Sequence, residues 1–300
     1  MRRAWWLLAI ACSGCGAPRA KTSDAEALVA VERLPAERRA LLTAYGRGGA
    51  EWEAAREQAL LDPAATRFLV ENLLLEMMRS YDTFAARTDP RARAAFVRAE
   101  TELARFGAAA ATPLVELLCV GDGIVADLAT KSLVRIGRDA LAPAEPALDH
   151  PEPKARRRVS ALFAALPHAG EREPAVRDAL RRLALGDPEW IVRAEAALAL
   201  GARGSRDVET APWRLILERA LVDADPAVRR SAAEGLFRLG DPRAIPALAN
   251  AMARAVTEGE VKLLAVVESA LAELAGDRRS RTPQAWLDWW RAHRGEFSKR

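Results

Sequence analysis

The stretch DPAVRRSAAEGLFRLGDPRAIPAL, residues 225–248, decides the fold of this 300-residue chain. Each of its two Asp-Pro pairs announces a helix. Proline fits the first helical turn, where its missing N–H would have no partner, and the preceding aspartate can cap exposed amides. Between the pairs, small and apolar side chains recur at helical spacing: Val228, Ala232, Ala233, Leu236 and Leu239. The stretch therefore predicts two helices joined by a tight turn, with a surface that a neighbouring helix can approach closely.

The same pattern recurs along the chain. With Arg229 as its anchor, positions three, four, six and seven residues later are small or aliphatic, and a turn residue follows at eleven. Similar segments are anchored at residues 96, 126, 156, 193 and 264, so successive anchors are 30, 30, 37, 36 and 35 residues apart. A period of this length, with two helices per unit, is typical of an α-solenoid. We therefore expect an all-α chain with one continuous array.

These segments resemble the HEAT and HEAT-like repeats of bacterial proteins, in the shorter form also found in phycobilisome lyase-type proteins. The resemblance covers residues 90–276, about six units. In that family, Asp and Arg side chains of successive first helices often stack in a ladder. The resemblance implies this role for Asp187 with Arg193 and for Asp225 with Arg229. Ala126 stands where the arginine belongs in its unit, so the ladder is expected to break there.

The first residues are typical of an exported lipoprotein. Arg2 and Arg3 precede a short apolar run at residues 4–12, and small residues follow, which favours a cleaved signal peptide over a membrane span. Ser-Gly-Cys at 13–15 resembles the end of a bacterial lipobox, which implies that Cys15 carries the lipid. Cys12 is the competing site, and a signal peptide cleaved without lipidation is a further alternative.

The chain is accordingly expected to comprise five segments. They are a signal peptide at 1–14, a lipid-anchored tether at 15–22, an N-terminal helical segment at 23–89, the repeat array at 90–276, and a capping helix with its tail at 277–300. Gly16, and not Asp, follows Cys15, which favours the outer over the inner membrane. The predicted location is therefore the periplasmic side of the outer membrane.

The C-terminal segment contains a cluster of tryptophans. Thr282-Pro283 begins its helix, and Trp286, Trp289 and Trp290 follow at i, i+3 and i+4, which places them on one side of the helix. The last repeat of a solenoid must cover its apolar face with something atypical, and large indoles do so well. We interpret the cluster as a structural cap, with an exposed aromatic binding surface as the alternative.

Residues that carry chemistry are sparse. His150, His168 and His293 lie far apart, and no two share a helix at metal-ligand spacing. The sequence has no HExxH, no CxxC with partner ligands, no phosphate-cradling glycine-rich loop and no nucleophile elbow. Cys119, in an apolar string, is interpreted as a small core residue. We therefore predict no catalytic, cofactor or metal site, and a protein that is not an enzyme.

Charge gives limited guidance on partners. The net charge is +4, and cleavage before Cys15 removes Arg2 and Arg3, leaving +2 (4 − 2), which does not favour nucleic acid. A basic run lies on one expected first helix, and further arginines lie on second helices, which we expect to line the inner wall of the array. The candidate partner-binding residues are Lys154, Arg156, Arg157, Arg158, Arg177, Arg181 and Arg214.

The sequence thus favours a monomeric, non-catalytic scaffold that is anchored by lipid and binds a protein partner through its concave surface. Two alternatives stay open: a chromophore-attachment or maturation factor like a bilin lyase, and a HEAT-like nucleic-acid-binding protein.

Overall fold

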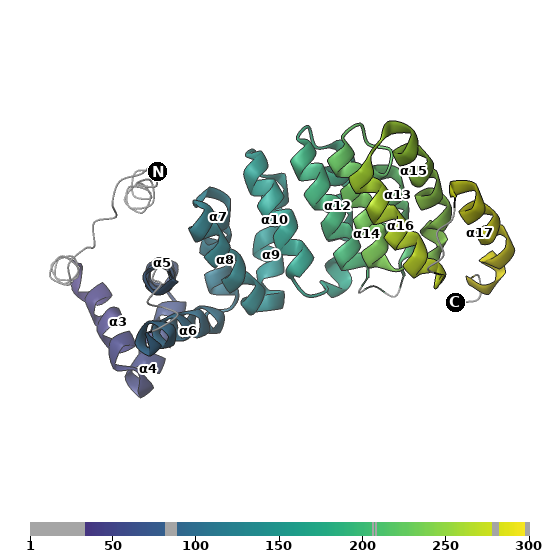
Figure 1. Cartoon of the computed structure of the whole chain (residues 1–300). Helices are drawn as coiled ribbons and strands as arrows, with labels where there is room; N and C mark the ends of the chain where they lie inside the picture. The colour runs from purple at the N-terminus through teal and green to yellow at the C-terminus, as the bar shows by residue number, and fades with distance from the viewer. Residues whose placement is uncertain (1–33, 82–88, 206, 208, 278–281, 298–300) are drawn as a thin grey trace. The chain divides into compact units, whose positions relative to one another are not determined.

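The computed structural model describes residues 34–81, 89–205, 207, 209–277 and 282–297. All regular elements within these ranges are helical, and the fold is an all-α solenoid (Figure 1). The predicted signal peptide, the tether, Cys12 and Cys15 lie outside the described residues. The chain divides into two compact units between Pro143 and Ala144, the N-terminal unit and the C-terminal unit.

The described part of the N-terminal unit is built from consecutive helices. They are α3 (Ala36–Arg47), α4 (Gly49–Leu60), α5 (Pro63–Tyr81), α6 (Pro90–Arg105), α7 (Ala108–Val120) and α8 (Gly123–Ile136). Gly48 separates α3 from α4 at φ +71°, a backbone conformation that glycine adopts without steric cost. Helix α5 buries Leu69, Leu73 and Met77 and contacts α3, α4, α6, α7 and α8, so it packs between the pair α3 and α4 and the helices α6 to α8.

The C-terminal unit consists of stacked helical hairpins. Its helices are α10 (Pro153–Ala165), α11 (Glu173–Gly186), α12 (Trp190–Gly204), α13 (Ala211–Ala220), α14 (Pro226–Leu239), α15 (Ile245–Glu258), α16 (Val261–Ala275) and α17 (Pro283–Phe297). The anchors Arg156, Arg193, Arg229 and Leu264 are each the fourth residue of a first helix. The repeat register read from the sequence is therefore the register of the structure.

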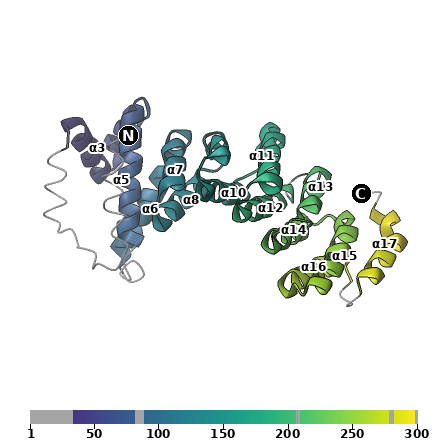
Figure 2. The same ribbon diagram turned by 90° about the horizontal axis from the view of Figure 1, so that it is seen from above.

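First and second helices form separate rows in the C-terminal unit. Figure 2 shows α10, α12, α14 and α16 in one row and α11, α13 and α15 in the other. Each first helix contacts the next, whereas α13 and α15 barely touch. The closest approach joins α12 to α14, where a Cβ on Gly201 would lie 2.4 Å from the Cα of Gly235. The row of first helices is therefore the more tightly packed row.

One expected second helix is broken. After α8, the chain forms three short pieces in place of a single helix: η2 (Gly137–Ala140), α9 (Leu141–Ala144) and η3 (Glu145–Asp149). Pro143 and Pro146 explain the break, because proline inside a helix removes a hydrogen bond and clashes with the preceding turn.

A bilayer-spanning helix is not found among the described residues. Only α6 and α7 taken together have the necessary length and apolar character, and the two are bent by 115° relative to each other.

Candidate functional site

A ladder of arginines and carboxylates runs along the first helices of the C-terminal unit. The Nε and Nη2 atoms of Arg156 donate to Asp187 at 2.6 and 2.9 Å, and those of Arg193 donate to Asp223 at 2.8 and 3.1 Å. Arg229 pairs in the same way with Glu260. Each arginine therefore joins its own first helix to the residues that precede the next first helix.

The same arginines also hold the loops before their own helices. The Nη1 atom of Arg193 donates to the carbonyls of Asp187 and Pro188, six and five residues earlier, at 2.9 and 3.2 Å. Arg156 and Arg229 make the equivalent pair of bonds. These side chains are only 4–16% exposed, so the ladder is a structural device and leaves little of its charge for a partner.

The ladder is present, but its pairs differ from those that the resemblance implied: Asp187 pairs with Arg156 and not with Arg193, and Arg229 pairs with Glu260 and not with Asp225. Arg193 pairs with Asp223 and not with Asp225, which instead caps α14 by accepting from the N–H of Ala227 at 2.8 Å. Burial alone would raise the pKa of Asp223. Hydrogen bonds from Arg193 and from the N–H of Asp225 outweigh burial and lower that pKa. Of the two aspartates before α14, the first therefore pairs with the arginine of the preceding repeat, and the second caps the helix.

A buried ion pair that the sequence analysis missed joins neighbouring repeats. Arg203 at the end of α12 is 1% exposed, and its Nε and Nη2 atoms donate to Glu173 at 2.6 and 2.5 Å. Its Nη1 atom donates to the carbonyl of Phe163 at 2.7 Å. His168 lies beside this pair, with its Nε2 atom 3.8 Å from Glu173. Arg203 lies in the last turn of α12, and nothing in the repeat pattern distinguishes it from a solvent-exposed arginine.

The structure does not bring the seven candidate partner-binding residues together. Lys154, Arg156, Arg157 and Arg158 lie on α10 in the first-helix row, whereas Arg177 and Arg181 lie on α11 and Arg214 on α13. Arg156 is occupied by the ladder. Arg214 is paired with Glu218 at 2.5 Å and with Asp241 at 3.2 Å, and Arg177 and Arg181 both approach Asp178. The charges therefore form two separate groups, one in each row.

The outward side of the first helices has a different composition. We define the first-helix surface as Arg157 on α10, Ile191, Glu195 and Leu198 on α12, and Arg230, Glu234, Phe237 and Arg238 on α14, all of them exposed or half-buried. Ile191 and Phe237 are 37% and 40% exposed. The surface thus combines aliphatic and aromatic side chains with charges of both signs.

Glu195 occupies the middle of this surface. It is half-buried, and it makes no hydrogen bond or ion pair with another described residue. Burial raises the pKa of its carboxyl group, and the nearby Arg157 and Arg238 only partly offset that effect. A desolvated carboxylate without a donor is costly, and a donor supplied from outside would recover part of that cost.

The tryptophans of α17 are divided by the fold. Trp286 is 2% exposed, whereas Trp289 and Trp290 are half-buried. Trp289 stacks on His293 with ring centroids 4.5 Å apart, and Trp290 stacks on Phe297 at 5.8 Å. Helix α17 packs on α15 and on η5 (Pro242–Ala244). The cap interpretation remains a prediction, now centred on Trp286.

Residues suited to chemistry stay dispersed in the part of the chain that the structure describes. No group of three or more His, Cys, Asp or Glu side chains there could hold a metal ion. Cys119 is half-buried on α7, and so is less enclosed than the core position that we expected.

Comparison with known proteins supports the repeat assignment. Residues 178–272, from α11 to α16, match the family model described as HEAT repeats. The chain contains a HEAT-repeat domain. No curated protein matches the chain.

Several solved structures resemble the chain that carries this HEAT-repeat domain. The complex of CpcE and CpcF of phycocyanin lyase from Nostoc sp. PCC7120 is 20% identical, over 60% of this chain and 96% of that one, with a TM-score of 0.40. An engineered protein is 18% identical, over 81% of this chain and 98% of its own, with a TM-score of 0.43. A Kap121p mutant is 14% identical, over 83% of this chain and 28% of its own, with a TM-score of 0.46.

Proposed function

We propose that this HEAT-repeat protein is a non-catalytic scaffold, anchored by lipid on the periplasmic side of the outer membrane, that binds a protein partner through the first-helix surface. Glu195 carries this proposal. A half-buried carboxylate without a donor is a stability cost that a binding site can explain, because a partner's N–H or cationic group would compensate it.

The composition of the surface supports the same assignment. Ile191 and Phe237 expose apolar area on the same surface as Glu195, and Arg157 and Arg230 add positive charge to it, whereas Arg238 is paired with Glu234 at 2.6 Å. Aromatic and arginine side chains are enriched at the energetic centres of protein interfaces. The second-helix arginines favour this role less, because Arg177, Arg181 and Arg214 each have a carboxylate nearby.

The packing of the two rows also supports the first-helix side. First helices contact one another at each step of the C-terminal unit, and α12 and α14 approach to backbone contact. In a curved array the more closely spaced row lies on the inside. We therefore expect the first helices to form the concave face, which differs from the sequence-based expectation for the second helices.

Site-specific photocrosslinking tests this surface. A photoreactive amino acid is placed at Leu198 or Phe237 in the intact protein in its own cells, with Leu215 on α13 as the control, because Leu215 is 53% exposed in the other row. We expect one adduct of the same mass from Leu198 and Phe237 and none from Leu215. Glu195→Arg should remove the adducts. Crosslinking from Leu215 alone would refute the proposal.

The anchor requires its own test. Labelling with an alkyne fatty acid should be lost in Cys15→Ala and kept in Cys12→Ala, and Cys15→Ala should release the protein into the soluble periplasmic fraction. The reverse pattern would assign the lipid to Cys12. Membrane attachment that persists in the double variant would rule out a lipid anchor.

A further inference from the structure

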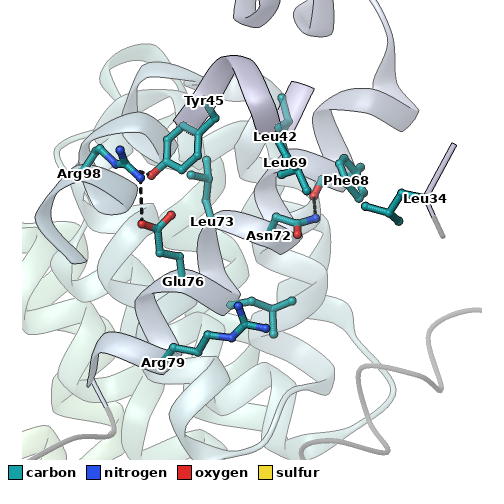
Figure 3. A pocket seen from close by; sticks show the side chains of 11 residues that line it. Leu34, Leu42, Tyr45, Phe68, Leu69, Asn72, Leu73, Glu76, Arg79 and Arg98 are labelled. Atoms are coloured by element: carbon teal, nitrogen blue, oxygen red, sulfur yellow. Dashed lines mark hydrogen bonds and ion pairs between the residues drawn. The ribbon is translucent and has the colours of Figure 1, made fainter. Parts of the chain in front are cut away.

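The N-terminal unit contains a cavity of about 580 Å³ that the scaffold role does not use (Figure 3). It lies between α3, α5 and α6, and its wall is mainly apolar. The apolar lining residues are Leu34, Leu42, Phe68, Leu69, Leu73 and Leu75. Pockets of roughly 300–1,000 Å³ with apolar walls and a few polar groups are typical of small-molecule sites.

One side of the cavity carries a polar network. The Nε atom of Arg98 donates to the Tyr45 hydroxyl at 3.1 Å, and its Nη2 atom donates to Glu76 at 3.2 Å (Figure 3). The guanidinium also stacks over the Tyr45 ring at 4.3 Å. Burial and the neighbouring Glu76 raise the pKa of Tyr45, so its hydroxyl stays neutral. The negative charge of Glu76 is thus already matched by Arg98.

Two further arginines lie near the cavity: Arg79 lines it, and Arg38 stacks on Phe68, which lines it. The guanidinium of Arg38 lies 5.0 Å from the ring centre of Phe68, and Arg79 is exposed at the cavity edge. Neither makes an ion pair with another described residue. Among the residues that line the cavity, two arginines, Arg79 and Arg98, therefore face one glutamate, and a ligand entering the apolar space would meet the uncompensated positive charge of Arg79.

The lining residues of α5 run along the length of the cavity from an apolar end to a charged end. Phe68, Asn72, Leu75 and Arg79 follow one another at helical spacing along one side of the helix. From Phe68 to Arg79 this stripe extends about 16 Å along the helix axis, a length comparable to that of an acyl chain. It begins with an aromatic ring and ends with the exposed guanidinium of Arg79.

We propose that this cavity binds a single-chain fatty acid. The acyl chain lies along the leucine and phenylalanine wall, where burial of apolar surface drives binding. The carboxylate lies at Arg79, where charge complementarity selects an anionic head group over a neutral one.

Fluorescence titration with cis-parinaric acid tests the cavity. The protein is the full chain carrying Cys12→Ala and Cys15→Ala, so that no attached acyl group competes. We expect saturable enhancement with one site per chain, displacement by palmitate, and much weaker displacement by hexadecanol, which has no carboxylate. Equal displacement by the two would refute recognition at Arg79.

Matched variants locate the site. Arg79→Glu should weaken binding about five- to tenfold, because an attraction becomes a repulsion at a partly solvated position. Arg93→Glu, at an exposed arginine of α6 outside the cavity, should leave binding unchanged. Leu42→Trp should fill the cavity and abolish binding, whereas Leu61→Trp, at an exposed leucine, should not. Melting curves of all four variants establish that the fold is kept.

Three other outcomes would overturn the proposal. Binding that none of these variants alters would place the probe elsewhere. Binding that appears only after deletion of residues 16–33 would show that the chain's own N-terminal segment occupies the cavity. The third outcome is that the protein sediments with phosphatidylglycerol vesicles without binding parinarate. If Arg79→Glu abolished that sedimentation, the positive charge of Arg79 would be assigned to contact with a membrane surface.

Discussion

Glu195 lies on the first helix α12 and Asp223 in the loop before the first helix α14, and the fold shifts their pKa values in opposite directions. Asp223 receives two hydrogen bonds from Arg193 and one from a backbone N–H, and these outweigh its burial. Glu195 is desolvated without a bonded donor among the described residues. One carboxylate therefore stabilises the folded array at neutral pH, and the other opposes it.

Loss of the ladder carboxylate should destabilise the C-terminal unit. Asp223→Asn removes a charged acceptor from Arg193, and we expect a loss of about 1–3 kcal/mol at pH 7. Because the folded pKa of Asp223 is lowered, its contribution is complete above the unfolded value of about 3.9 and disappears as the pH falls through the folded value. Urea unfolding at pH 7, 5 and 3 should show a difference that shrinks only below about pH 4. A constant difference across this range would contradict the assignment.

The converse is expected for Glu195. Its folded pKa is raised, so its favourable contribution is complete below the unfolded value of about 4.3 and is lost as the pH rises through the folded value. Glu195→Gln should therefore stabilise the protein by about 0.5–1 kcal/mol at pH 7 while weakening partner capture. Thermal melts at pH 7 and pH 4 measure the change. Glu268→Gln, on the exposed side of α16, is the control. An equal gain in stability there would mean that the effect of Glu195→Gln does not come from desolvation of Glu195.

At the scale of elements, the contact between α12 and α14 determines how closely the first helices stack. A side chain at Gly201 would meet the backbone of Gly235, and one at Gly235 would meet the carbonyl oxygen of Ala197 at 2.9 Å. Neither backbone atom can move without moving its helix. The two glycines therefore allow a close approach of the helices, and neither has a positive φ.

Substitution of one methyl group tests this contact. Gly201→Ala should cost about 1–3 kcal/mol, because α12 and α14 must separate to admit the new atom. Gly186→Ala is the matched control: Gly186 ends α11 and has no atom within 4 Å of an added Cβ. Alanine there should be neutral or stabilising by up to about 1 kcal/mol, since it favours the helix. Chemical unfolding of both variants gives the comparison, and a tolerated Gly201→Ala would mean that the helices are not in backbone contact.

Helix positions were predictable from local signals. Asp-Pro at the start of α14 and glycine at its end mark its limits, and Arg193 and Arg229 gave the correct register. Which of Asp223 and Asp225 pairs with Arg193 was not predictable. The two aspartates are two residues apart in one loop, and the position of Arg193 in the neighbouring repeat determines which one it reaches. The break in the segment after α8 could have been predicted from Pro143 and Pro146. The repeat pattern, with two helices per unit, instead led us to expect a continuous helix there.

At the scale of the whole molecule, the sequence predicted the architecture, whereas the binding surface that we propose rests on the structure. The regular spacing of the anchors indicates which residues pack between neighbouring repeats, and this spacing predicts an α-solenoid. Which row is exposed to a partner depends on helix spacing between repeats, which no single repeat encodes. Basic side chains such as Arg156 and Arg214 therefore looked available in the sequence, although ladder and helix partners occupy them. Glu195 gave no signal, because desolvation depends on neighbours from other helices.

The C-terminal end of the array provides the last prediction. Trp286 is buried, whereas Trp290 keeps part of its surface in solvent and stacks on Phe297. If α17 seals the array, Trp286→Ala should cost about 3–5 kcal/mol, as for other large buried aromatics, and Trp290→Ala clearly less. Truncation after Gly276 should expose an apolar end and cause self-association, measurable by light scattering. If both alanine variants melt like the native protein and the truncated chain stays monomeric, α17 is not a cap, and its aromatic side chains become the next surface to test for a partner.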